Sequence, residues 1–164
     1  MKPNDIHRMD AKIWKARYPA LKVIAPAEGR AKIEEIVPVD GTTVDFADPA
    51  VRLITVPGTG DKELALLVEG GSGTTLVLND LIFNLANRPG LAGWLFKTVG
   101  MTGDEPHIPP VVKMKQVDDK VALKAQLQRW SQLPNLKRIL VSHGPMIADQ
   151  PAAVLARIAH QLAA

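Results

Sequence analysis

The sequence predicts an α/β domain in which a mainly antiparallel sheet carries helices, and three observations support this prediction. Residues 63–69 and 74–79 are short apolar runs separated by Gly-Gly-Ser-Gly, which supplies the positive φ angles of a tight turn and indicates an antiparallel hairpin. Residues 119–133 and 149–162 repeat apolar positions at steps of three and four, as amphipathic helices do. With 164 residues and 46% apolar content, the chain is expected to form one domain spanning 1–164.

The remaining elements follow from apolar spacing and from proline and glycine. Asp118 or Asp119 is expected to cap the helix at 119–133, and Pro134 ends it. The other predicted elements are a helix at 8–18 that stops before Pro19, a buried strand at 21–26 (LKVIAP), a weak helix at 28–35, and strands at 51–56 (VRLITV) and 137–142 (KRILVS).

Composition excludes several classes of partner. The 20 Lys and Arg residues are dispersed among 17 Asp and Glu residues, and aromatic content is only 4%, so we expect no nucleic-acid partner. No apolar stretch approaches the roughly 20 residues that cross a bilayer, so we expect no membrane partner. The first ten residues lack the apolar core of a signal peptide and the chain has no cysteine, which together favour a cytoplasmic protein.

Residues 85–115 are rich in glycine and proline and too long for an ordinary connection. Because the segment begins five residues after Asp80, we predict a partly mobile cover beside that carboxylate. The apolar residues at 94–96 (Trp-Leu-Phe) are predicted to pack on the core rather than to form a substrate platform.

Asp80 and His143 are the candidate functional residues, because each directly follows the apolar part of a predicted strand. A buried carboxylate needs compensation, which a divalent ion bound by both residues would supply. Alternatively, Asp80 caps the helix or turn after its strand, and His143 is a satisfied strand-end histidine. A Ser142–His143–Asp80 triad is excluded because neighbouring strand residues point to opposite faces. His107 and His160 are expected to face solvent.

Ordered segments of the chain resemble motifs of the metallo-β-lactamase-like hydrolase fold. They are a histidine before a helix ending in RYP, then KVIAP, VPGTG, LVLNDLIFN and ILVSHG. The chain is most similar to an uncharacterised branch with a "PN..H" start and "NDLLFN"-like and "VSHG"-like segments. The resemblance covers nearly the whole chain and implies a shortened αββα sandwich with a mainly antiparallel sheet.

The family's usual HxHxDH motif is largely absent. The resemblance places His7 on the last histidine of the motif, whereas Lys2 and Asn4 replace its first two histidines and Ile6 replaces its aspartate. Thr59 stands where the family has the histidine of a "PGHT"-like loop. The ligand set that the resemblance leaves is His7, Asp80 and His143, assigned to the second of the family's two metal positions.

Two functions from different classes follow. The first is a metal-dependent hydrolase-like protein in which His7, Asp80 and His143 hold one divalent ion (Zn, Fe or Mn), Asp80 and His143 are catalytic, and water attacks an ester, lactone, thioester or phosphodiester. The alternative is a non-catalytic binding or interaction module with a decayed site and no metal. Only six residues precede His7, so the chain is a shortened member or part of a longer product. Either case predicts an open sheet edge and a homodimer formed through it.

Overall fold

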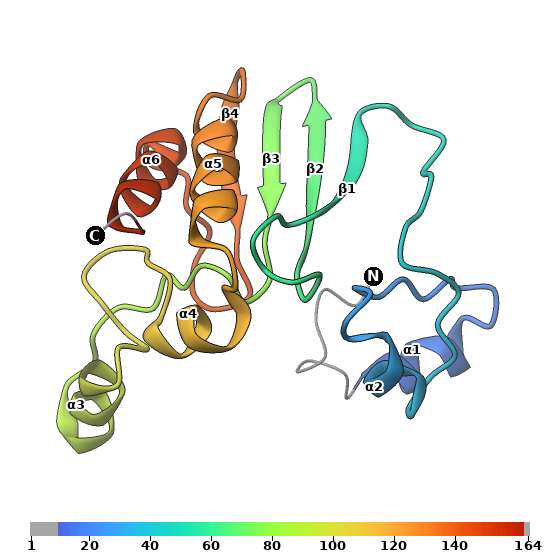
Figure 1. Ribbon diagram of the computed structural model, residues 1–164, viewed down its shortest axis with the longest axis horizontal. Helices are drawn as coiled ribbons and strands as arrows, with labels where there is room; N and C mark the ends of the chain where they lie inside the picture. The colour runs from blue at the N-terminus through green and yellow to red at the C-terminus, as the bar shows by residue number, and fades with distance from the viewer. Residues whose placement is uncertain (1–9, 163–164) are drawn as a thin grey trace.

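A four-stranded sheet in the order β1-β2-β3-β4 forms the centre of the computed structural model, which describes residues 10–162 (Figure 1). Strand β1 (Val51–Thr55) pairs antiparallel with β2 (Leu64–Gly70), and β2 pairs antiparallel with β3 (Gly73–Val77). Strand β4 (Leu136–Leu140) lies parallel to β3. The predicted hairpin is therefore confirmed, and the sheet is mixed rather than purely antiparallel.

Six helices lie in the described part of the chain, at residues 10–162. Among residues 10–162, no helix has the length and the apolar run that a bilayer crossing requires. The helices are α1 (Ala11–Arg17), α2 (Arg30–Glu34), α3 (Gly90–Thr98), α4 (Pro110–Gln116), α5 (Lys120–Ser131) and α6 (Pro151–Gln161).

The main core lies between the sheet and the last two helices. Leu67, Leu76 and Ile139 lie opposite one another on three neighbouring strands, and all three are buried. Leu127 of α5 and Leu155 of α6 belong to the same hydrophobic cluster. In Figure 1, α5 and α6 run beside β4. The apolar spacing that predicted both helices therefore corresponds to the faces that they bury.

A long crossover joins the parallel strands β3 and β4. Parallel strands cannot be joined by a tight turn, and residues 78–135 make this connection through α3, α4 and α5. Asp119 caps α5, because its side chain accepts hydrogen bonds from the backbone N–H groups of Val121 and Ala122. The predicted cap is confirmed.

The N-terminal region has a small hydrophobic cluster of its own around Ile33 of α2. The strand predicted at 21–26 is wrong, since only Ile24 forms a β-bridge, with Gly41. The neighbouring N–H of Val23 donates instead to the Asp40 carboxylate at 2.7 Å, so the ladder cannot extend. That the whole chain forms one domain stays a prediction.

Strand β1 lies at an edge of the sheet. Its backbone bonds to β2 alternate along the strand, so the backbone groups of Leu53 and Thr55 point away from β2. The N–H of Val51 at the start of the strand donates to Asp48 O at 3.0 Å. Pairing of a second copy with this edge stays a prediction.

Candidate functional site

The ends of β3 and β4 bring two pairs of polar residues together. Beyond the ladder, Leu78 N donates to Leu140 O at 2.8 Å and Ser142 N donates to Asn79 O at 3.4 Å. The parallel pairing therefore continues past both strands, and the residues that follow each strand meet. Asn79 meets Ser142, and Asp80 meets His143.

Asp80 and His143 are in direct contact. His143 Nε2 lies 2.8 Å from Asp80 Oδ1, although the two residues are 63 positions apart in the sequence. Asp80 is 3% exposed, whereas the His143 side chain is 30% exposed and is therefore reachable from solvent. A carboxylate can only accept a hydrogen bond, so Nε2 carries a proton in this arrangement. His143 is thus a partner that helps to offset the burial of Asp80.

Two neighbours fix the position of the imidazole. The Phe83 ring stacks on the His143 ring, with centroids 4.1 Å apart and an interplanar angle of 27°. Gly144 turns the chain with φ +111, and a Cβ there would lie only 2.0 Å from Asn84 O. Asn84 N donates to His143 O at 2.8 Å, which joins the two segments at this point. Glycine is required at position 144 by both conformation and space.

Glu63 is a site residue that the sequence analysis missed. It is fully buried, and its Oε1 accepts hydrogen bonds from the backbone N–H groups of Asn79 at 3.0 Å and Asp80 at 3.1 Å. The Glu63 carboxylate thereby holds the backbone that carries Asp80. An available signal was the position of this acidic residue, directly before the apolar strand β2 and after a Gly-rich loop.

Ser142 does not act on His143. Its Oγ donates to Asn79 Oδ1 at 2.6 Å, which agrees with the exclusion of a Ser-His-Asp triad. Asn79 is buried, and its Nδ2 has no hydrogen-bond partner among the described residues. A buried amide donor therefore lies one residue from Asp80.

The hypothesis that Asp80 caps a helix is wrong, whereas capping of the turn after β3 stays a prediction. No helix follows β3 directly, because the next one, α3, begins at Gly90. The carboxylate contacts the His143 imidazole instead. Asp80 therefore belongs to a contact between two strand ends.

The resemblance also pointed to two other ligand positions, residues 7 and 59. His7 lies outside the described residues. Thr59, which replaces a family histidine, is fully buried, and its Oγ1 donates to Val56 O at 2.8 Å. Within residues 10–162, no group of three or more His, Cys, Asp or Glu residues could hold a metal ion. The described donors that converge are Asp80 and His143.

The two remaining histidines differ in exposure. His160 is exposed, as predicted. His107 is only partly exposed, because its ring nitrogens lie 3.0 Å from the carbonyl oxygens of Glu105 and Gly100. Those contacts hold the ring in the crossover, where residue 107 also forms a β-bridge with Phe83.

The crossover segment 85–115 lies partly beside the site and partly away from it, and the cover beside Asp80 stays a prediction. Helix α3 protrudes away from the sheet at the lower left of Figure 1. His107 of the same segment pairs instead with Phe83, whose ring stacks on His143. The apolar patch at 94–96 is not packed on the core, because Trp94, Leu95 and Phe96 are all more than half exposed. The mobility of this segment stays a prediction.

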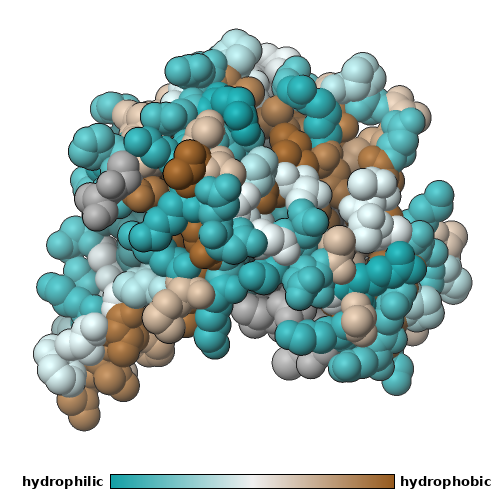
Figure 2. Space-filling view, in the orientation of Figure 1, coloured by the Kyte–Doolittle hydropathy of each residue, from teal (hydrophilic) through white to brown (hydrophobic). Residues whose placement is uncertain are grey.

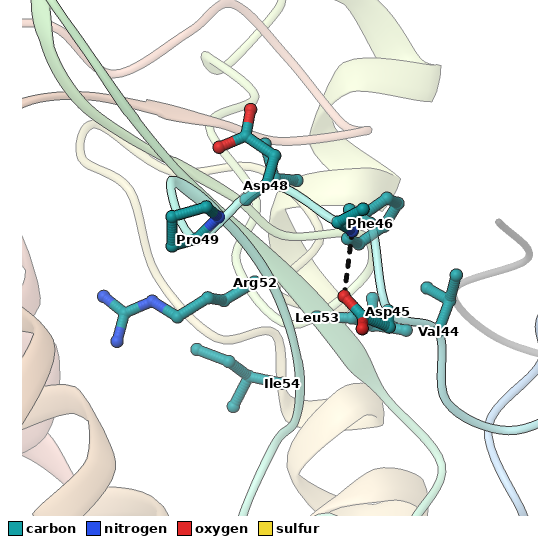
Figure 3. Close-up of a pocket in the computed structure, with 10 residues that line it drawn as sticks. Val44, Asp45, Phe46, Asp48, Pro49, Arg52, Leu53 and Ile54 are labelled. Carbon is teal, nitrogen blue, oxygen red and sulfur yellow. Dashed lines mark hydrogen bonds between the residues drawn. The ribbon is translucent and has the colours of Figure 1, made fainter.

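Two surface hollows lie near the ends of the sheet strands or beside β1. One of about 580 Å³ adjoins the loop after His143 and is lined by residues that include Asn84, Met146 and Arg157. Another of about 700 Å³ lies between the loop at 44–50 and β1 (Figure 3). Asp80 and His143 line neither hollow. The lining of the first includes Asn84, whose backbone N–H donates to His143 O, so the first is the candidate substrate recess.

Comparison with solved structures defines the fold. Metallo-β-lactamase FIM-1 from Pseudomonas aeruginosa, in a mono-zinc form, matches 98% of this chain and 65% of its own with a TM-score of 0.55 and 13% identity. Metallo-β-lactamase DIM-1 matches 98% of this chain and 67% of its own with a TM-score of 0.57 and 10% identity. The chain has a metallo-β-lactamase fold. TTHA1623 in a di-iron-bound form matches 96% of this chain and 72% of its own with a TM-score of 0.54 and 16% identity.

The metallo-β-lactamase fold confirms the predicted fold class, and the sheet is mainly antiparallel, with only β3 and β4 parallel in the described residues. The chain spans about two thirds of the length of these solved structures. No protein-family model and no curated protein matches the sequence. Since the identities lie between 10% and 16%, the likeness defines the fold alone and assigns no role to Asp80 or His143.

Proposed function

We propose that this chain is a metal-dependent hydrolase-like protein whose reduced site holds one divalent ion through Asp80 and His143, with His7 as the third ligand. The observation that carries the proposal is that Asp80 Oδ1 and His143 Nε2 converge to 2.8 Å. A bound ion would take the place of the proton on Nε2. A carboxylate oxygen and an imidazole nitrogen are ligand types that Zn, Fe and Mn accept. FIM-1 and TTHA1623, which share the fold, are described as zinc-bound and iron-bound respectively.

The donor set fits one ion rather than two. Asp80 supplies negative charge in a buried position, and His143 supplies a nitrogen that solvent can reach. Thr59 is unsuited to replace the missing histidine because its hydroxyl is buried and bonded to the backbone. Among the described residues, the site therefore has two converging donors, to which His7 would add one.

Each neighbour of the ion site has a defined task. Glu63 holds the backbone of Asn79 and Asp80 by two hydrogen bonds, and Phe83 orients the imidazole. A divalent ion, when bound, would lower the pKa of a water molecule and polarise a carbonyl or phosphoryl oxygen. The substrate is an ester, lactone, thioester or phosphodiester, and the 580 Å³ hollow beside the loop after His143 gives it room.

A specific observation favours the alternative function, a non-catalytic module with a decayed site. Asp80 and His143 are joined by a direct hydrogen bond, and Thr59 has a structural role at a family ligand position. Elemental analysis of protein purified without chelators separates the two functions. Near-stoichiometric metal, or metal restored by added Zn, Fe(II) or Mn, supports the hydrolase-like site. Substoichiometric metal that none of these ions restores supports the interaction module.

A further inference from the structure

Helix α3 exposes almost all of its apolar side chains. Its only buried residue is Gly93, the reverse of an ordinary surface helix, which turns its apolar face inward. In Figure 2 the hydrophobic colour gathers at the lower left, on the protrusion that α3 forms in Figure 1. The exposed fractions are 81% for Leu91, 61% for Trp94, 55% for Leu95, 52% for Phe96 and 51% for Val99.

Helix α3 packs its glycine side against the segment that leads into it. A Cβ at Gly93 would lie 1.9 Å from Arg88 O, so the absence of a side chain lets the two backbones touch. A cavity of about 330 Å³ remains beneath the helix, lined in part by Leu85, Ala92 and Phe96. The contact that fixes α3 therefore leaves its apolar residues outside the core.

The apolar side chains form one broad convex face. At about 100° per residue, Leu91, Leu95 and Val99 form a central stripe, with Trp94 and Phe96 on its two sides. Together they span an arc of about 200°, along a helix roughly 13 Å long. Such a face protrudes and is not a groove into which another chain could fit.

Two cationic side chains lie outside the apolar arc of this helix, on the polar side and before its first turn. Arg88 precedes the helix and Lys97 lies within it, and neither has an ion pair among the described residues. The nearby carboxylates have partners, since Asp104 accepts from Asn87 at 2.7 Å and Glu105 pairs with Arg157 at 3.1 Å.

The neighbouring helix α4 also exposes an apolar side chain between cationic ones. A Cβ at Gly100, just after α3, would lie 2.7 Å from Pro110 at the start of α4, so the two helices adjoin. Helix α4 carries Lys113 and Lys115 around Met114, which is 82% exposed. Apolar and cationic side chains thus alternate on the same part of the molecule.

We propose that α3 is an interfacial helix that docks this protein onto an anionic phospholipid bilayer. The leucines and aromatic rings would enter the boundary between headgroups and acyl chains, while Arg88 and Lys97 meet the lipid phosphates. The expectation of no membrane partner rested on the lack of a spanning segment, and an interfacial helix does not need one. This proposal is independent of the Asp80–His143 site.

A second copy of the chain fits this face less well. Five side chains of this kind, each more than half exposed, offer roughly 500 Å² to a partner, against about 800 Å² per partner in a stable interface. Symmetric contact through α3 would also bring Arg88 and Lys97 of both copies together, and like charges oppose that arrangement.

The test is co-sedimentation of the full chain with large unilamellar vesicles of phosphatidylcholine alone or of phosphatidylcholine with 30% phosphatidylglycerol. We expect binding to the phosphatidylglycerol vesicles that weakens at 0.5 M salt. The double variant Leu91→Ser/Leu95→Ser is expected to bind at least tenfold more weakly. The matched control Ile13→Ser/Leu21→Ser, which changes exposed apolar residues elsewhere, is expected to bind like the parent.

A charge variant tests the second half of the proposal. Arg88→Gln/Lys97→Gln is expected to reduce binding to the anionic vesicles several-fold and to leave binding to neutral vesicles unchanged. Thermal melting checks that each variant is folded. The proposal is overturned if the parent does not bind the anionic vesicles, or if Leu91→Ser/Leu95→Ser binds as the parent does. A parent dimer that this variant dissociates, without vesicle binding, would assign the face to a second copy.

Discussion

Replacing His143 by Ala should destabilise the protein through its effect on Asp80. The substitution removes a hydrogen bond to a buried charged group, worth about 1.5–3 kcal/mol, and the ring contact with Phe83, worth about 0.5–1 kcal/mol. Because the imidazole is 30% exposed, water can replace part of the lost bond. We therefore expect the free energy of unfolding to fall by about 2–3 kcal/mol without metal.

Replacing Asp80 by Asn should have a smaller effect, about 1 kcal/mol or less, because the amide oxygen still accepts from Nε2. The free energy of unfolding of the double variant Asp80→Asn/His143→Ala should then fall by at least about 1 kcal/mol less than the two single losses added together. The reason is that the double variant has no buried charge at position 80 that lacks the His143 donor. Urea unfolding followed by circular dichroism measures all four proteins, and His160→Ala is the control for an exposed histidine.

Metal distinguishes the proposed ion site from a structural contact. An ion that binds only the folded chain should stabilise it by about 2.7 kcal/mol at one hundred times the dissociation constant, which is roughly 5–10 °C in unfolding temperature for a chain of this size. His160→Ala should keep this response, whereas Asp80→Asn and His143→Ala should lose it. An unchanged response in both variants would refute the ion site, and additive losses in the metal-free cycle would refute the coupling between the two residues.

Three further substitutions test the supports of the site and of the fold. Glu63→Ala should destabilise the protein by about 2–4 kcal/mol in denaturant titrations, because two buried N–H groups lose their acceptor. Glu63→Gln keeps an acceptor oxygen and should cost clearly less. Equal losses in the two variants would contradict the role of Glu63 as a hydrogen-bond acceptor. Gly144→Ala should cost more than about 2 kcal/mol and weaken metal binding in calorimetry, while Gly71→Ala, where a Cβ meets nothing within 4 Å, should be nearly neutral. Asp119→Ala should cost about 1 kcal/mol in thermal melts through loss of the α5 cap, and an equal loss in Asp118→Ala would argue against capping.

Local chemistry explains which elements the sequence could predict. The hairpin depended on the glycine-rich turn between two apolar runs, and helix α5 depended on its Asp119 cap and its apolar spacing. The strand predicted at 21–26 had the right composition, but the Asp40 carboxylate takes the N–H of Val23 and interrupts the ladder. That competition comes from a side chain 17 positions away and leaves no local trace.

The site was only partly predictable for a related reason. Asp80 and His143 could be named because polar residues at strand ends tend to converge, and the parallel pairing of β3 and β4 brings them together. Glu63 was missed because its role depends on backbone N–H groups of another strand. Residues 94–96 were misjudged because apolar side chains usually lie inside, and composition does not reveal that α3 stands off the core.

The parallel pairing of β3 with β4 also sets the order in which the molecule can assemble. Strands β1, β2 and β3 are joined by short connections and can associate early, whereas β4 can join only after residues 78–135 have closed a long loop. The contact between Asp80 and His143 depends on that last closure. A chain that has formed its hairpin but not yet recruited β4 would have β structure and no site. Formation of the His143 contact therefore reports the completion of folding, and refolding kinetics followed at Phe83 and His143 should lag behind those of the hairpin.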